Sequence, residues 1–373
     1  MFMSNLKLVD KKIFMKKPYL KSIEYIRGVS MLGVVAIHVG SQYLMNPTPN
    51  INLVALLEIV SRFSVPIFFF ISAFGLFYKI DLNAPFDYGN FLRRRFNAVL
   101  IPYLVWSVFY IVHDNFFYES GIPAPGWAAE ILFFGLAKYQ LYFLVILIWF
   151  YLLMPVWIKI LKNLTPELFV MILITQIIFN YFSSYSVALF QFTQSLPADS
   201  ILKMFLQWRL NYLVLHYVFI FLLGGIFAIH SGQFFRRLKS GKKFVTGIFV
   251  ATLILHLGYF YYLVFAKHYT PLDAVNTAHQ LSPTGFFYTI AASIFLFMLF
   301  ENYRFRGIVQ DILSLTGKNS YFVYLFHPLA IMYLNLLLAK FNIVMSAPIA
   351  LIFYAATVLI SLSVGVVWKK VLG

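Results

Sequence analysis

The sequence predicts an all-α, polytopic membrane protein with about ten transmembrane helices, each built from the roughly 20 apolar residues that a bilayer requires. Hydrophobic residues make up 61% of the 373 residues, and charged residues only 11%. Soluble domains carry about 25% charged residues, so this composition excludes an ordinary soluble protein. The chain has no cysteine, which excludes disulfides, thiol nucleophiles and cysteine metal sites.

Ten apolar runs are long enough to cross the membrane. They cover residues 23–43, 53–78, 96–116, 139–158, 166–184, 211–229, 244–266, 284–300, 315–337 and 347–368. The polar connection 185–210 is expected to include a short interfacial helix. No linker separates domains, so residues 1–373 are predicted to form a single integral-membrane domain, in which 1–22 is a basic N-terminal segment.

Lysine and arginine predict the orientation. When the chain passes through the ten runs in order, 21 of its 29 lysine and arginine residues fall on the side that holds both termini. Cytoplasmic loops carry this excess in membrane proteins, so we expect both termini to be cytoplasmic. The net charge of +16 is therefore explained by topology, and nucleic acid is not an expected partner.

The first run carries three polar residues on one helical face. It reads "IEYIRGVSMLGVVAIHVG" and contains Glu24, Arg27 and His38. At about 100° per residue, His38 lies roughly 20° past three full turns from Arg27, and Glu24 lies roughly 60° to the other side. Charged side chains inside a bilayer usually face a cavity or a partner. The alternatives are a snorkelling anchor for Arg27, a packing hydrogen bond for His38 and neutralisation of Arg27 by Glu24.

The second run holds Glu58 and Arg62 at the i, i+4 spacing of a helical ion pair, and Ser72 lies near the face of Glu58. A kink is expected at Pro66. The pair could act directly in a reaction, or it could be a structural ion pair in the outer leaflet.

Three arginines, Arg93, Arg94 and Arg95, lead into the third run from the predicted cytoplasmic side. Guanidinium groups form charge-assisted, often bidentate hydrogen bonds with phosphate. A phosphorylated carrier arriving from the cytosol would meet them there. The alternative is a purely topological anchor.

The ninth run, "TGKNSYFVYLFHPLAIMYL", places Ser320, Tyr324 and His327 on one face at spacings of four and three residues. Pro328 predicts a kink that neighbouring polar groups would stabilise. A purely structural role for these residues is the alternative. The remaining histidines lack the spacing of metal ligands, so no metal site is predicted.

These segments together resemble the acyltransferase-3 family of integral-membrane acyltransferases, particularly the branch that modifies bacterial cell-surface polysaccharides. The first run has the family's pattern, which is an acid, an arginine-glycine pair and a histidine ten residues after the glycine; here these are Glu24, Arg27-Gly28 and His38. The segments "SRFSVPIFFFISAFGLFY", "FLRRRFNAVLIPYLVWS", "YQLYFL" and "SLTGKNSYFVYLFHP" follow in the family's order. Two positions depart from it: Ala98 replaces a second arginine, and Ala73 replaces a glycine after Ser72.

The resemblance implies a bacterial inner-membrane enzyme that takes acetyl- or succinyl-coenzyme A from the cytosol, with no permanently bound cofactor. The acceptor would be a hydroxyl of a lipid-linked or exported glycan, and a polysaccharide synthase complex would be a further partner. His38 would be the general base. Arg27, oriented by Glu24, would hold the donor or the developing oxyanion. The coenzyme phosphates would bind Arg94 and Arg95.

The resemblance gives the other polar residues acceptor-side or orienting roles, with His327 and Tyr324 foremost and Ser72 as a candidate acyl relay. Two different functions fit the same residues. A polysaccharide exporter or flippase could use the polar face as a path, and a structural subunit of a synthase complex would need the charges only for assembly. Consumption of acyl-coenzyme A distinguishes the enzyme from both.

Overall fold

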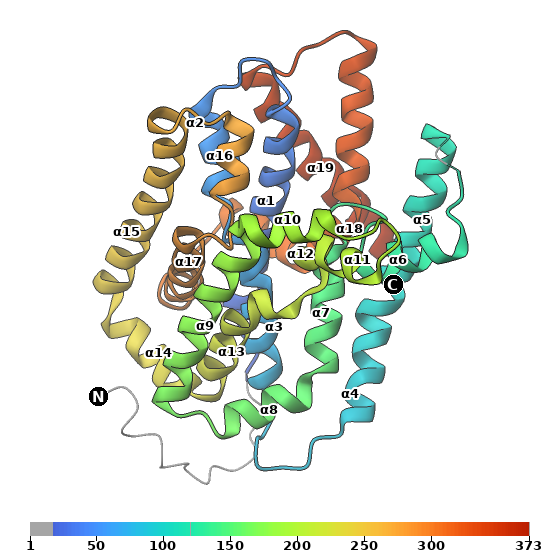
Figure 1. Ribbon diagram of the computed structural model, residues 1–373. Coiled ribbons are helices and arrows are strands. Elements are labelled where there is room, and N and C mark those ends of the chain that lie inside the picture. The colour runs from blue at the N-terminus through green and yellow to red at the C-terminus, as the bar shows by residue number, and fades with distance from the viewer. Residues whose placement is uncertain (1–17, 120, 373) are drawn as a thin grey trace.

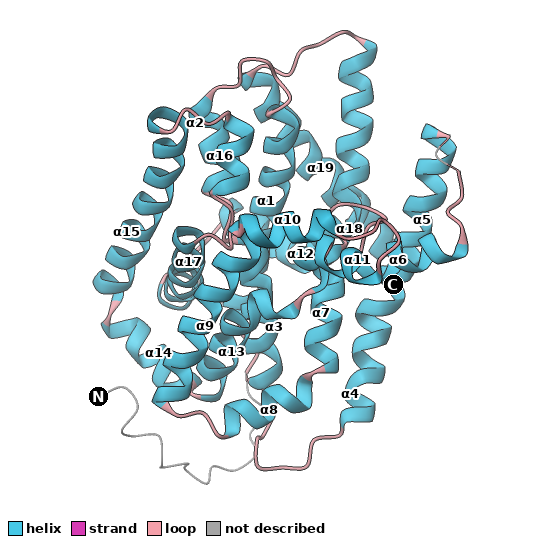
Figure 2. Cartoon of the chain, in the orientation of Figure 1, coloured by secondary structure: helices cyan, strands magenta, loops and turns pink. Residues whose placement is uncertain are grey.

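The computed structural model describes residues 18–119 and 121–372, and in these residues the chain is helical and has no strand (Figures 1 and 2). The all-α prediction is confirmed. Eight helices of the described residues are long and apolar enough to cross a membrane, and two bent helix pairs would raise the number to ten. The cytoplasmic placement of the termini stays a prediction, and most of the basic segment 1–22 lies outside the described residues.

The long helical segments form an upright bundle in Figure 1. In chain order they are α1 (Lys21–Tyr43), α2 (Ile51–Val54) with the π-helical turn η1 (Ala55–Ile59) and α3 (Ser64–Phe77), α4 (Tyr88–Arg95) with the π-helical turn η2 (Phe96–Leu100) and α5 (Ile101–Tyr118), α9 (Pro166–Tyr185), α15 (Lys242–Tyr261) with the π-helical turn η4 (Tyr262–Ala266), α17 (Pro283–Asn302), α18 (Ile308–Lys340) and α19 (Ala347–Leu372).

Bent and short helices complete the chain. The helix α7 (Tyr142–Leu152) bends by 60° into α8 (Met154–Lys162), and the segment of η3 (Val214–Tyr217) and α13 (Val218–Ile229) bends by 94° into α14 (Ser231–Ser240). The short helices are α6 (Pro125–Phe134), α10 (Val187–Ser195), α11 (Ile201–Gln207), α12 (Arg209–Tyr212) and α16 (Pro271–Thr277). The helices α10 and α11 lie across the bundle in Figure 1, where a short interfacial helix was expected.

The second span breaks before the predicted kink. Residues 60–63 form a turn between η1 and α3, three to six residues before Pro66. A proline ring clashes with the carbonyl group four residues earlier, which here belongs to Arg62. The irregular backbone therefore lies at Arg62, and Pro66 itself lies in the first turn of α3.

The third span starts earlier than expected. The Asp87 carboxylate accepts a hydrogen bond from the Asn90 backbone N–H at 3.1 Å and so begins a helix that continues to Tyr118. Hydrogen bonds from Asn90 also lower the pKa of Asp87. The three arginines 93–95 are consequently part of this helix and do not precede it. The ninth span is likewise longer than expected, because α18 continues through Pro328 for 33 residues.

A buried polar network supports the 3₁₀ turn η3. The Gln176 amide nitrogen donates to the Leu215 carbonyl at 2.7 Å, and its oxygen accepts from the Phe219 N–H at 3.0 Å. Asn180 contacts the His216 ring at 3.1 Å. Backbone groups inside a membrane must find partners within the protein, so this network allows the run 211–229 to be irregular and gives His216 a structural role.

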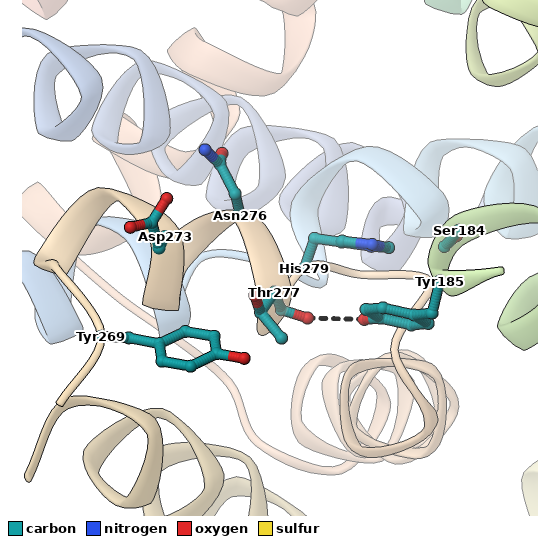
Figure 3. A pocket seen from close by; sticks show the side chains of 7 residues that line it. All are labelled: Ser184, Tyr185, Tyr269, Asp273, Asn276, Thr277 and His279. Carbon is teal, nitrogen blue, oxygen red and sulfur yellow. Dashed lines mark hydrogen bonds between the residues drawn. The ribbon is translucent and has the colours of Figure 1, made fainter. Parts of the chain in front are cut away.

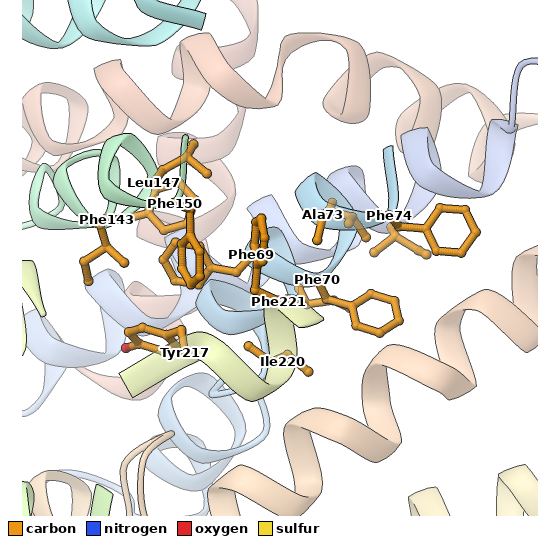
Figure 4. Close-up of a cluster of buried hydrophobic side chains, with 14 of the residues drawn as sticks. Phe69, Phe70, Ala73, Phe74, Phe143, Leu147, Phe150, Tyr217, Ile220 and Phe221 are labelled. Atoms are coloured by element: carbon orange, nitrogen blue, oxygen red, sulfur yellow. The ribbon is translucent and has the colours of Figure 1, made fainter. Parts of the chain in front are cut away.

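Aromatic rings fill the core between α3, α7 and α13 (Figure 4). Phe150 and Phe221 stack with ring centroids 4.1 Å apart, and Phe69 lies 5.4 Å from Phe150. Gly224 allows α13 to approach the Phe70 carbonyl group so closely that a side chain there would clash with the backbone. Small residues at such crossings are typical of membrane helices.

Helix α1 is central and packs most extensively on α18. The two helices run in parallel, because Ser314 donates to Glu24 near their first turns and Asn335 donates to Gln42 at 2.8 Å near their ends. Two glycines form the crossing. A Cβ atom on Gly28 would lie 2.5 Å from the Leu313 carbonyl oxygen, and one on Gly317 would overlap the Glu24 carbonyl group.

We predict that Gly28→Ala lowers the thermal stability of the purified protein in detergent, by roughly the 1–3 kcal/mol that overpacking costs. The backbone of α18 must move away, since the obstructing atom belongs to the main chain. Tryptophan fluorescence during heating measures the change.

The matched control is Gly75→Ala in α3, where, apart from the neighbouring turns of its own helix, no atom of the described residues lies within 4 Å of the added methyl group. This variant should melt at or above the wild-type temperature, because alanine favours a helix over glycine. Equal melting temperatures for the two variants would contradict the close crossing of α1 and α18.

Candidate functional site

A cavity of about 360 Å³ lies beside His38, and we call it the His38 cavity. Five parts of the chain meet there: α1, the irregular segment before α3, the start of α7, α16 with the turn after it, and α18. The lining residues are Val34, Ile37, His38, Ser41, Gln42, Leu44, Arg62, Val65, Tyr139, Gln140, Tyr142, Phe143, Leu272, Val275, Asn276, Gln280 and Tyr324.

Three rings gather at one wall of the His38 cavity. His38 stacks on His327 with ring centroids 5.2 Å apart and lies 4.5 Å from the Tyr139 ring. His327 is fully buried, and its Nδ1 lies 3.0 Å from the Val323 carbonyl oxygen. A carbonyl only accepts hydrogen bonds, so Nδ1 carries the proton. The Nε2 atom of His327 is then an acceptor, and it has no partner among the described residues.

Arg62 contributes a positive charge to the lining of the His38 cavity. Its guanidinium group bonds to Glu58 at 2.7 Å, and the fully buried Glu58 carboxylate also accepts a hydrogen bond from Ser41 at 2.8 Å. The predicted ion pair is therefore present. A buried carboxylate needs such partners, and together they fix the direction of Arg62. The Nε atom of Arg62 is buried and lacks a partner in the described part of the chain.

A tight turn before α7 presents Gln140. The Tyr324 hydroxyl group donates to the Gln140 carbonyl oxygen, and Lys138 forms an ion pair with Asp114 at 2.8 Å. Gln140 is 2% exposed. It lies beside the Tyr110 hydroxyl group, yet neither of its amide atoms makes a hydrogen bond of good geometry to a described residue. Buried polar atoms are rarely left unpaired, so this amide is a candidate ligand contact.

A second cationic group lies near the first turn of α1. The charges of Arg27 and Arg95 interact with each other and with the Tyr151 hydroxyl group. The Arg95 guanidinium lies 5.6 Å from the Phe91 ring centroid and 5.7 Å from that of Tyr151. Arg27 is exposed at the protein surface, and Arg95 is half-buried. The eleven residues from Arg27 to His38 correspond to a rise of about 16 Å.

Glu24 does not pair with Arg27 in the described structure. Its carboxylate accepts hydrogen bonds from Tyr19 and Ser314, and Lys318 lies 3.9 Å away. The bond from Tyr19 raises the pKa of this tyrosine to about 12. In the structure the contacts of Glu24 with Ser314 and Lys318 join α1 to α18, and its orienting role toward Arg27 stays a prediction.

The structure thus brings His38, Arg62 and Tyr324 to one cavity, with Glu58 and His327 directly behind them. Other predicted residues lie elsewhere: Arg93 and Arg94 are exposed, Ser320 donates to the Gly317 carbonyl at 2.9 Å, and neither Ser320 nor Ser72 lines the cavity.

Several lining residues were not predicted, namely Ser41, Gln42, Asn276 and Gln280. Ser41 and Gln42 follow His38 by three and four residues, so the helical period could have placed them on its face. Asn276 lies in the short helix α16 and Gln280 in the turn after it, and these segments carry no such periodic signal.

Comparison with known proteins identifies the family of the chain. The model of the family Acyl_transf_3, described as an acyltransferase domain, matches residues 20–366. No curated protein and no solved structure matches the chain. The family match covers nearly the whole chain, including every residue of the His38 cavity. The chain belongs to the Acyl_transf_3 family and is a membrane protein of the acyltransferase class.

Proposed function

We propose that the protein transfers an acetyl or succinyl group from acyl-coenzyme A to a hydroxyl group of a cell-surface or lipid-linked glycan, in the inner membrane of a bacterium. One observation carries the proposal. The His38 cavity combines an imidazole, a fixed guanidinium and an unpaired buried amide in a space of about 360 Å³. These groups are the ones that acyl transfer to a hydroxyl requires.

His38 acts as the general base in this proposal. It takes the proton of the acceptor hydroxyl while the hydroxyl oxygen attacks the thioester carbonyl carbon. A C–O bond forms, the C–S bond breaks, and coenzyme A leaves as a thiolate that takes up a proton. The stack against His327 and the contact with Tyr139 support this role, because they hold the His38 ring at the cavity wall.

Arg62 stabilises the oxyanion that develops on the thioester oxygen. A preorganised cation in a site that excludes water is effective because it needs no rearrangement during the reaction. The bond to Glu58, which Ser41 supports in turn, supplies this preorganisation. Arg62 is preferred to Arg27 for the oxyanion, since Arg62 lines the same cavity as His38 and Arg27 does not.

Arg27 and Arg95 bind the phosphates of the coenzyme. Their guanidinium groups are close enough to interact electrostatically, so an anion between them would relieve the repulsion of like charges. The unpaired Nε atom of Arg95 offers a further donor. The narrow pantetheine arm would then extend along α1 over the rise of about 16 Å to His38. The exposed Arg93 and Arg94 add positive charge that attracts the donor.

We predict that His38→Ala lowers the rate of acyl transfer by at least about 100-fold, the lower end of what a general base contributes. The assay uses purified protein in lipid nanodiscs, radiolabelled acetyl- or succinyl-coenzyme A, and glycan extracted from the host membrane. The variant should keep its affinity for acyl-coenzyme A, because Arg27 and Arg95 are unchanged.

The control for this variant is His268→Asn, in a loop where the backbone has a φ of 55° that asparagine tolerates. It should transfer acyl groups at the wild-type rate. Full turnover by His38→Ala would refute the assignment of the base. A wild-type protein that never consumes acyl-coenzyme A would favour the exporter, and loss of assembly alone in His38→Ala would favour the structural subunit.

For the donor half of the site, we expect Arg95→Ala to raise the KM for acyl-coenzyme A about tenfold or more, while kcat changes little. A hydrogen bond to a charged group is worth about 1.5–3 kcal/mol. Initial rates measured at varied concentrations of acyl-coenzyme A give KM and kcat separately. Arg236→Ala, which removes an exposed arginine of α14, should leave both constants unchanged. An equal KM for the two variants would place the phosphates elsewhere.

A further inference from the structure

A second hollow of about 340 Å³ adjoins the His38 cavity, and we call it the Tyr269 hollow. It lies where α9 ends and where the chain passes from η4 to α16 and α17 (Figure 3). Its lining residues are Ser184, Tyr185, Tyr269, Asp273, Asn276, Thr277 and His279. Asn276 lines both spaces, so the two are neighbours across a single side chain.

One wall of the Tyr269 hollow is held by a ring stack and a hydrogen bond, and the opposite side is open to the surface. Tyr185 stacks on His279 with nearly parallel rings 5.4 Å apart, and its hydroxyl group donates to the Thr277 carbonyl at 2.5 Å (Figure 3). Tyr269 is 42% exposed, and its side chain lies across the opening from this stack. The buried hydroxyl oxygen of Ser184 has no partner in the described part of the chain. The hollow therefore offers ring faces beside polar atoms that are free to bind.

The charge of the Tyr269 hollow is negative. Burial, aided by the charge of Arg62, lowers the pKa of His279 to about 4, so this imidazole is neutral at pH 7. Asp273 is then the lining residue with a formal charge. Its carboxylate accepts a hydrogen bond from Thr270 at 2.6 Å, and its side chain remains exposed. An anionic ligand would be repelled there, whereas hydroxyl groups can donate to the carboxylate.

We infer that the Tyr269 hollow binds a second, uncharged sugar unit of the acceptor glycan, next to the unit that is acylated in the His38 cavity. The inference rests on the proposed function. Ring faces pack against the C–H face of a sugar, and the carboxylate, amide and hydroxyl groups around them match its hydroxyl groups. Because Asn276 borders both spaces, consecutive units of one chain can occupy them together. The acceptor is accordingly an oligosaccharide without uronic acids at this position.

The test compares acceptors of different length. Surface glycan extracted from the host is cut and separated into fragments of one sugar unit and of several units, and acyl transfer to each is measured in nanodiscs. Tyr269→Ala should raise the KM for the longer fragments about tenfold, equivalent to about 1.4 kcal/mol of binding. It should leave kcat and the KM for single units unchanged. Tyr269→Phe, which keeps the ring, should retain most of the affinity.

The matched control is Tyr118→Ala, which removes a tyrosine that is 57% exposed at the end of α5 and is not part of the hollow. It should behave as wild type with both fragment sizes. A similar effect of Tyr269→Ala on both sizes, or on neither, would overturn the inference. Asp273→Asn should weaken the discrimination against uronic-acid fragments, and unchanged discrimination would count against the proposed charge selection.

A direct binding measurement separates this inference from the proposed function. Saturation-transfer NMR detects contact between the longer fragments and the wild-type protein in nanodiscs without any acyl donor, and Tyr269→Ala should abolish that signal. If the wild type binds longer fragments through Tyr269 but transfers no acyl group, the proposed function fails and the sugar site remains. If acyl transfer occurs and no Tyr269-dependent contact is found, the sugar site fails alone.

Discussion

The parallel contact between α1 and α18 holds the candidate site together. Ser314 and Glu24, which join the two helices, are 290 residues apart in the chain. In a bilayer the hydrophobic effect does not drive helices together, so close packing and hydrogen bonds must do so. Gly28 and Gly317 allow the close approach, and the bonds to Glu24 and Gln42 fix the register. The same register brings His38 against His327.

Irregular backbone borders the cavity where the cation is needed. The π-helical turn η1 carries Glu58, and the following turn carries Arg62. Irregular backbone is tolerated at membrane depth only where protein or a cavity satisfies it, and π-helical turns are frequent at functional sites. The departure from a straight second helix therefore directs Arg62 toward His38. A regular helix that was kinked only at Pro66 would lack this irregular backbone at Arg62.

The sequence predicts those features that depend on local periodicity. Apolar runs of sufficient length predict the spans, the 3.6-residue period places Glu24, Arg27 and His38 on one face, and the i, i+4 spacing predicts the pair of Glu58 with Arg62. Contacts between distant segments carry no such signal. Glu24 accepts a hydrogen bond from Ser314, far away in the sequence, and Asn276 reaches the cavity from the short helix α16, so only the folded chain reveals these contacts.

The register of α1 on α18 also determines when the candidate site can form during synthesis of the protein. The chain emerges N-terminus first, so α1 enters the membrane with Glu24, Arg27 and His38 long before α18 exists. Until residues 327 and 335 have been made, His38 lacks the ring of His327 and Gln42 lacks the amide of Asn335. Earlier helices must shelter these polar groups in the interval, and the second span, in which α2, η1 and α3 all pack against α1, is the first in chain order that can do so.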